Sequence, residues 1–366
     1  MAASIQTAIP ESPLAETAIA ASAVPSAPIG VSVVVCCYNS AKVLPTTLLH
    51  LSRQICTSDL HWEVIVVDNG STDGTANVAR NTWSADCKIP FRVVCESRLG
   101  LSFARDRGIT ESRYEFIAFV DDDNWVAPDW VARVAATMID HPGVGALGGS
   151  VEPAFASDFR WGDPLQFFLP ISARDVDAGD VTSRPDAIIG AGMTVRRTAL
   201  NQLQSRSFHV VSVGRQGTNL YGAEESELLL ALRLLGWKHW RSNDLLIKHF
   251  IPDHRTEWRY LRRLAFGTGR SACALEPMFF ALKPARRGFS LAIRNLRQSW
   301  ASQVLLSLAE FLKSPLKAIR LSGGDREGDP EQLKMDYLRG HLAGLLAARA
   351  WYNQRSRQVH KTFSLV

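Results

Sequence analysis

The chain has 366 residues, of which 46% are hydrophobic and 21% charged, so its composition is that of an ordinary globular protein with one large or two modest cores. It contains no run of about eighteen apolar residues, which argues against a membrane-spanning helix. The net charge of +5 is unevenly distributed: residues 255–320 hold thirteen Lys or Arg and only three Glu, which predicts a basic face for anionic lipid, phosphate or an acidic polymer.

The first thirty residues and the cysteines indicate the setting of the protein. Residues 1–30 contain no Lys or Arg, and four prolines interrupt their apolar stretches, so we expect a disordered tail rather than a secretory signal. The six cysteines show neither CxxC pairs nor metal-ligand spacing. We therefore expect free thiols and a reducing, cytoplasmic location.

β-Branched runs alternate with helical patterns over the first third of the chain. Strands are expected at 31–37, 63–67, 92–95 and 116–123, with helices at 42–54, near 75 and near 100. Such alternation predicts a parallel α/β sheet, in which ligands bind at the carboxyl ends of the strands. Tyr38, Asp68 and Asp121 each stand where an expected strand ends, so we expect them to converge on one crevice, which favours a nucleotide site.

The run Asp121-Asp122-Asp123 is the clearest chemical signal in this half. Side chains alternate along a strand, so Asp121 and Asp123 should point to the same side, where a divalent cation would relieve their repulsion. Carboxylate oxygens suit Mg²⁺ or Mn²⁺, which a diphosphate could share. The alternative is an acidic run that only precedes the helix expected near Pro128, and the triplet alone does not decide between the two.

The second half is expected to extend the sheet less regularly. Helices are expected at 129–141 and 224–235, strands at 144–151, 187–197, 237–240 and 245–249, and a long loop, a possible lid, at 155–187. Glu224 and Glu225 begin the second of these helices, a position that favours acidic residues whether or not they react. His249 follows an apolar strand, where a structural role is the more common one.

The chain after residue 255 is helical and basic in character. It contains an apolar stripe at 300–312 and a last helix expected near 331–355. The stripe favours packing within the chain, but the basic residues on both sides of it keep peripheral binding to an anionic membrane open.

Six of these segments resemble, in the same order, the motifs of family 2 glycosyltransferases. They are residues 33–39, 66–75, 104–105, 119–123, 222–228 and His249. The resemblance covers about residues 31–255 and is strongest to bacterial and cyanobacterial enzymes of surface-polysaccharide assembly. It implies a GT-A fold, an α/β architecture with a mostly parallel central sheet flanked by helices. The nucleotide-binding half would be 31–125, the acceptor half 126–255 and a basic helical extension 256–366.

The resemblance also assigns the donor site. Asp121 and Asp123 match the DxD motif, and His249 matches a histidine that completes the metal or diphosphate site, with Mg²⁺ or Mn²⁺ as the implied ion. In the same scheme Tyr38 packs on the nucleotide base and either Asp68 or Asn69 hydrogen-bonds it. The remaining residues implied to bind the nucleotide are Cys36, Arg105 and Asp122.

Glu225 is assigned as the catalytic base, at a position where the family commonly has Asp after Glu. The implied reaction is an inverting transfer from a nucleotide-diphosphate sugar to a hydroxyl of a glycan or a lipid-linked glycan, in polysaccharide or glycoconjugate assembly. It would take place in the cytoplasm, with a position at the inner face of the plasma membrane allowed by the basic segment.

Three other functions compete with this interpretation. A catalytically inert nucleotide- or sugar-binding scaffold would not need the carboxylates at 121, 123 and 225. A nucleotidyltransferase usually has a Gly-rich phosphate loop, which is absent around residues 36–42. Nucleic-acid binding is not expected, because the basic segment matches no known module.

Overall fold

The computed structural model describes residues 25–159, 161–162, 176–184, 187–212, 214–216, 219–220, 222–282, 296, 298–312 and 327–363. Most of the expected tail, most of the loop at 155–187 and much of the basic segment therefore lie outside the described residues. Residues 25–30 of the expected tail are described, and the Ser26 N–H donates to Glu115 Oε2 and to Thr198 Oγ1, both at 3.0 Å. Among the described helices, none has the length and hydropathy needed to cross a bilayer.

Four parallel strands form the first half of the sheet, as predicted. They are β1 (Val31–Cys37), β2 (Trp62–Asp68), β3 (Phe91–Cys95) and β4 (Phe116–Asp121), in the order β3-β2-β1-β4. The helices α2 (Leu44–Ser52), α3 (Thr75–Thr82) and α4 (Leu101–Glu111) connect them. Cys36 lies beside Asp121 and Cys37 beside Asp68, so the carboxyl ends of these strands lie at one edge.

The sheet becomes mixed beyond β4. It continues through β8 (Thr194–Arg196), β6 (Val144–Phe155), β9 (Lys238–Ile251) and β5 (Asn124–Val126), and the two-residue β7 (Gly179–Asp180) pairs with β9. β8 is antiparallel to β4 and β6, whereas β6 and β9 are parallel. The first four strands are therefore all parallel, and the rest of the sheet contains both parallel and antiparallel pairs.

Two strand predictions differ from the structure in extent. The strand expected at 187–197 is reduced to β8, because residues 187–193 turn through Gly192, whose φ of 78° is in the left-handed region. The strands expected at 237–240 and 245–249 are one strand, β9, whose pairing with β6 jumps from Arg241 to Leu246. The polar residues 242–244 thus form an irregularity within a strand and not a break between two.

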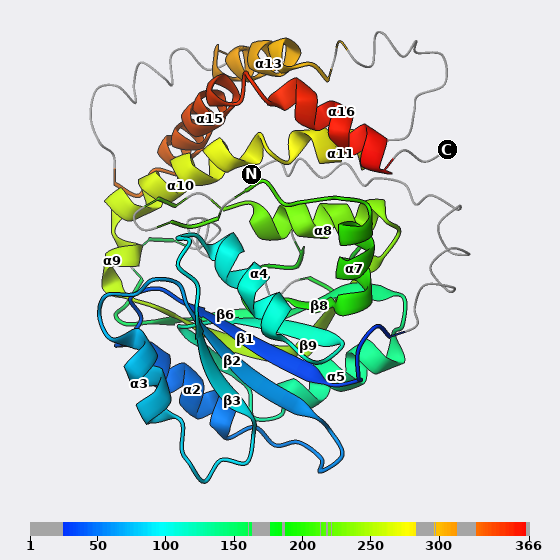
Figure 1. The fold of residues 1–366 in the computed structure, drawn as a ribbon. Coiled ribbons are helices and arrows are strands. Elements are labelled where there is room, and N and C mark those ends of the chain that lie inside the picture. The colour runs from blue at the N-terminus through cyan, green and yellow to red at the C-terminus, as the bar shows by residue number, and fades with distance from the viewer. Residues whose placement is uncertain are drawn as a thin grey trace.

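Helices cover both faces of the sheet (Figure 1). One face packs on α2 and α5 (Trp130–Asp140), whose buried residues share a core with Val33 and Val35 of β1. The other face packs on α4, α7 (Arg197–Ser205) and α8 (Glu224–Leu234), in a core that includes Val34. The alternation along β1 thus divides the apolar side chains between two cores.

The C-terminal helices form further layers beyond α8 (Figure 1). After the short α9 (Asp253–Thr256), which lies beside the sheet, they are α10 (Trp258–Ala272), α11 (Glu276–Leu282), α13 (Trp300–Leu312), α15 (Pro330–Ala347) and α16 (Tyr352–Phe363). The single helix expected near 331–355 is therefore two, separated by a turn at residues 348–351 that contains no Gly or Pro to signal it.

Two contacts hold this layer together. α10 and α15 cross so closely that a Cβ at Gly340 would lie 2.0 Å from the Phe266 carbonyl oxygen. Met278 of α11 and Val359 of α16 belong to the same core as Leu229 of α8. Packing is therefore continuous across the boundary expected near residue 255.

Candidate active site

A cluster of possible metal ligands lies where β4 ends. Asp121, Asp123 and His249 each offer one ligand atom, and these atoms all lie within 4.8 Å of one another. Asp121 ends the strand while Asp123 lies in the turn to β5, so simple strand alternation does not explain their shared position. Instead β5 pairs antiparallel with β9, which sets Asn124 opposite His249. The Asp123 carbonyl also accepts a hydrogen bond from the Phe250 N–H at 2.9 Å.

The chemistry of this cluster fits a divalent cation. His249 is 1% exposed, and neither of its ring nitrogens has a hydrogen-bond partner among the described residues, although Nε2 lies 3.5 Å from Asp123 Oδ1. Two carboxylates and one imidazole are ligands that Mn²⁺ accepts, and Mg²⁺ favours the carboxylates. Buried polar atoms are normally satisfied, so a buried imidazole without a partner beside two carboxylates supports the predicted metal site.

Arg255, which the sequence analysis did not select, also contacts this cluster. Its Nη1 lies 2.9 Å from Asp123 Oδ2. Burial alone would raise the pKa of Asp123, but His249 and Arg255 lower it well below its usual range. The only sequence signal for Arg255 is its place at the start of the basic segment, six residues after His249, which does not separate it from its neighbours.

Asp122 faces away from this cluster towards the β1–α2 loop. Its carboxylate accepts a hydrogen bond from the Ser40 hydroxyl, and its carbonyl accepts one from Thr47 Oγ1 at 2.7 Å. Burial, together with the charge of Asp123, raises the pKa of Asp122 to about 7. Its predicted contact with the nucleotide stays a prediction.

The residues predicted to hold the base lie at the ends of β1 and β2. The Tyr38 ring is 42% exposed and therefore open to a ligand. Asp68 accepts one hydrogen bond, from the Ser71 N–H at 3.0 Å. The Asn69 side chain, in contrast, donates to the carbonyls of residues 96 and 98 and accepts from the Gly100 N–H at 2.8 Å. Of the two alternatives, Asp68 is thus the one with free hydrogen-bonding capacity.

Cys36 stands beside Asp121 at the end of β1. Burial raises the pKa of its thiol to about 12, so it lines the site as a neutral group. All six cysteines are described and none is in a disulfide.

Arg105 links the strand edge to the first turn of α8. Its Nη1 lies 3.1 Å from Glu224 Oε1 and 3.0 Å from Glu225 Oε2, and its guanidinium lies over the Phe119 ring of β4. A side chain on Gly190 would displace this group, because a Cβ there would lie 2.6 Å from Glu225 Oε2 and 2.7 Å from Arg105 Nη2. Arg105 therefore holds the glutamate pair, and its predicted contact with the nucleotide or diphosphate stays a prediction.

The two glutamates of the pair are in different environments. The Glu224 side chain is 4% exposed and that of Glu225 is 31% exposed. Burial, and next the charge of Glu225, raises the pKa of Glu224 to about 7. Burial would also raise the pKa of Glu225, but Arg105 lowers it, so Glu225 is the ionised carboxylate that a substrate can reach.

The glutamate pair lies close to the cluster of possible metal ligands formed by Asp121, Asp123 and His249. Burial and then Asp123 raise the pKa of Asp121, while Arg105 and His249 oppose this, and Glu225 is close enough to raise it further. Acidic groups from β4 and α8, about a hundred residues apart in sequence, therefore act on one another.

Comparisons with known proteins agree with this geometry. Residues 32–203 match the family model of glycosyl transferase family 2. The putative glycosyltransferase EpsH of Bacillus subtilis is 36% identical over 110 residues, which are 30% of this chain and 30% of the relative. The uncharacterized glycosyltransferase YfnE of the same species is 37% identical over 102 residues, 28% of this chain and 25% of the relative. The chain thus spans less than a third of either relative.

A longer match and a solved structure extend the similarity beyond residue 203. Glucosyl-dolichyl phosphate glucuronosyltransferase of Haloferax volcanii is 22% identical over 250 residues, 68% of this chain and 78% of the relative. The mannosyltransferase PcManGT of Pyrobaculum calidifontis, solved in complex with GDP-Man and Mn²⁺, superimposes with a TM-score of 0.55 at 18% identity. The superposition covers 89% of this chain and 88% of that one. Residues 32–203 therefore match glycosyl transferase family 2, and the chain has the GT-A fold.

Proposed function

We propose that the protein is an inverting glycosyltransferase that moves a sugar from a nucleotide-diphosphate sugar to a hydroxyl acceptor in polysaccharide or glycoconjugate assembly. The observation that carries this proposal is the single site formed by Asp121, Asp123 and His249 on one side and Glu225 on the other. GDP-Man and Mn²⁺ in the structurally similar PcManGT support a donor of this class.

The donor would lie along the carboxyl edge of the strands. Tyr38 would stack on the base, Asp68 would hydrogen-bond it, and Cys36 would line the site as a neutral group. Mg²⁺ or Mn²⁺ held by Asp121, Asp123 and His249 would neutralise the diphosphate as a Lewis acid. Arg255, beside Asp123, supplies a further positive charge for the leaving group.

The transfer step is a direct displacement. An acceptor hydroxyl oxygen attacks the anomeric carbon from the face opposite the diphosphate, and Glu225 takes the hydroxyl proton. The bond between the anomeric carbon and the diphosphate oxygen breaks, and its electron pair leaves with the nucleoside diphosphate. One displacement inverts the configuration. Arg105 keeps Glu225 ionised and oriented for this role.

A hydrolysis and transfer assay over UDP-, GDP- and TDP-sugars with Mn²⁺, Mg²⁺ or EDTA tests the proposal. We expect metal-dependent release of nucleoside diphosphate from at least one donor. Glu225→Gln should lower the transfer rate by about 10²- to 10⁴-fold, as loss of a general base does. Glu257→Gln, at an exposed Glu outside the site, is the matched control. Nucleotide binding without turnover in every condition would instead support the inert scaffold.

We also propose that the protein works at an anionic membrane surface. α13 packs on α15 through Gln303 and Ser307, which are buried. Trp300 and Val304 of the stripe at 300–312 pack against the core that includes Leu345 and Tyr352, as predicted, whereas other apolar side chains of α13 are exposed. The outward leucines, with Leu296 just before the helix, are 61–67% exposed: Leu296, Leu305, Leu306 and Leu312. The sequence flanking α13, residues 283–297 and 313–320, carries eight Lys or Arg and no acid.

Sedimentation with vesicles tests this membrane contact. The protein should bind vesicles that contain phosphatidylglycerol and not neutral phosphatidylcholine vesicles, because leucines insert while the basic flanks attract anionic lipid. Leu305→Asp with Leu306→Asp should abolish the binding, and Leu49→Asp, at an exposed leucine of α2 on the far side of the molecule, should not (Figure 1). Equal binding by both variants would contradict the proposal.

A further inference from the structure

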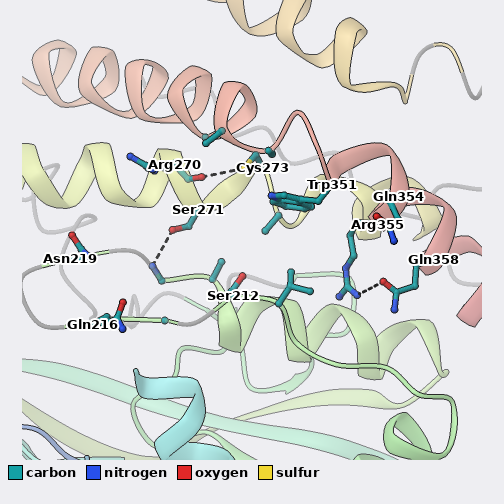
Figure 2. A pocket seen from close by; sticks show the side chains of 18 residues that line it. Ser212, Gln216, Asn219, Arg270, Ser271, Cys273, Trp351, Gln354, Arg355 and Gln358 are labelled. Atoms are coloured by element: carbon teal, nitrogen blue, oxygen red, sulfur yellow. Dashed lines mark hydrogen bonds between the residues drawn. The ribbon is translucent and has the colours of Figure 1, made fainter. Parts of the chain in front are cut away.

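A cavity of about 590 Å³ lies between the start of α8 and the C-terminal helices (Figure 2). Gly222 and Ala223 line it from the α8 side. Arg270 and Ser271 line it from α10, and the α15–α16 turn contributes Trp351. The cavity is thus closed by the part of the chain that the family model at residues 32–203 does not cover.

This cavity reaches the turn that carries the proposed base. Ala223, in its wall, donates its N–H to Glu224 Oε2 at 3.0 Å. Gly214, also in the wall, approaches Glu224 so closely that a Cβ there would lie 2.8 Å from Glu224 Cδ. The Gly222 N–H donates to Ser271 Oγ at 3.1 Å, which ties the wall to α10. The wall therefore contacts Glu224, the neighbour of Glu225 in sequence, although neither glutamate is itself a lining residue.

The cavity wall combines an apolar surface with polar groups; its two cations are Arg270 and Arg355, and Arg355 is paired with Glu227. Trp351 offers an aromatic surface, and small apolar residues of α15 and α10 surround it. The amide side chains Asn219, Gln354 and Gln358 stand around the opening, each with both a donor and an acceptor (Figure 2). None of the described lining residues is acidic. A sugar ring has this same pairing of an apolar C–H face and a hydroxyl rim.

The walls are held together by a buried ion pair. Arg355 of α16 is 3% exposed, and its Nη2 donates to Glu227 Oε1 of α8 at 2.5 Å. Glu227 also accepts the N–H groups of Val211 and Ser212, both at 3.1 Å. The Arg355 Nε is buried and has no acceptor among the described residues, so a hydroxyl group in the cavity could satisfy it.

We propose that this cavity is a glycan subsite that holds sugar residues of the acceptor, with Trp351 against a ring face and Gln354, Gln358 and Asn219 on the hydroxyls. The inference rests on the proposed transferase function and adds to it the place and chemical class of the acceptor. It also gives the C-terminal helices a role in selecting the acceptor.

Saturation-transfer NMR on the full chain tests the subsite directly. The probes are the methyl glycosides of glucose, galactose, mannose and N-acetylglucosamine, and n-octanol serves as the lipid-tail probe. We expect at least one glycoside to bind, Trp351→Ala to weaken it at least about fivefold and Gln354→Ala less, as for an interface anchor and its surroundings. Gln204→Ala, at an exposed glutamine of α7, is the control and should leave binding unchanged.

Two results would overturn the subsite. One is that no glycoside binds, or that the affinity is the same in Trp351→Ala and Gln354→Ala as in the wild type. Gln354 is exposed, so its substitution should leave the fold intact. The other is that n-octanol binds at Trp351 and displaces the glycosides, which would make the cavity an alkyl-chain site. Binding of UDP and GDP with Mn²⁺ is measured on the same samples and tests the proposed function separately. Absence of nucleotide binding would contradict the proposed function, whereas absence of glycoside binding would contradict only the subsite.

Discussion

The strand edge and the first turn of α8 both present carboxylates to the site, but they hold them in place by different means. At the strand edge, backbone pairing sets the positions, because β1 aligns Cys36 with Asp121 and β5 aligns Asn124 with His249. At α8, distant cations set them: Arg105 of α4 holds Glu224 and Glu225, and Arg355 of α16 holds Glu227. One region is fixed by the sheet, the other by ion pairs.

This difference predicts how each region responds to substitution. A carboxylate lost from the strand edge leaves the backbone frame intact, so activity should fall without loss of fold. A cation lost from the α8 region leaves a buried carboxylate unpaired, so stability should fall as well. Substitutions in the two regions can therefore be told apart by measuring both quantities.

Asp123→Asn is expected to give the largest effect. It keeps the shape of the side chain but removes a ligand charge, and Lewis-acid stabilisation of a leaving diphosphate amounts to several kcal/mol. We expect transfer to fall by about 10³- to 10⁴-fold and the thermal shift caused by Mn²⁺ to disappear. The urea midpoint should fall less than in Arg355→Leu, because Arg255, the cation left without its partner, is 25% exposed. Asp86→Asn, at an exposed Asp between α3 and β3, is the control for a generic loss of charge. Full Mn²⁺-dependent turnover by Asp123→Asn would refute the metal assignment.

Arg355→Leu tests the ion pairs of the α8 region. The Arg355 and Glu227 side chains are 3% and 0% exposed, and breaking a buried pair costs about 3–5 kcal/mol. We expect that loss in the free energy of unfolding, measured by urea denaturation. Arg357→Leu, at an exposed position on the same helix, is the matched control. A double variant, Arg355→Leu with Glu227→Leu, should recover part of the loss, since it leaves no unpaired charge.

The same contrast explains what the sequence could predict. The parallel strands follow from local patterns, and the contiguous Asp121 and Asp123 mark where the cluster lies. The pairing of β5 with β9, which brings His249 to them, is not local. Arg105, Arg255 and Arg355 take their roles from carboxylates 119, 132 and 128 residues away, and no local pattern marks them among the other arginines. Likewise the sequence offers Asn69 as a residue that could hydrogen-bond the nucleotide base, whereas its amide forms hydrogen bonds with the backbone of residues 96 and 100. The break between α15 and α16 was missed because no Gly or Pro accompanies it.

His239 should make the support beneath α8 sensitive to acid, with the smallest effect of the three. Burial, and next the charge of Arg233 in α8, lowers its pKa from 6.5 to about 4. His239 therefore takes up a proton more readily in the unfolded chain than in the folded one. Its contribution to the free energy of unfolding is fully present above pH 6.5 and is lost as the pH drops towards 4. From these two pKa values the contribution of His239 to this loss between pH 7.5 and pH 5.5 is roughly 1 kcal/mol. Asp122 and Glu224, whose pKa values are raised to about 7, titrate in the same window with the opposite sign, so the test is a difference between two proteins. Between pH 7.5 and pH 5.5, the change in unfolding free energy measured by urea denaturation should be less favourable in the wild type than in His239→Met by about that amount. Equal changes in the two proteins would mean that His239 titrates alike in the folded and unfolded states.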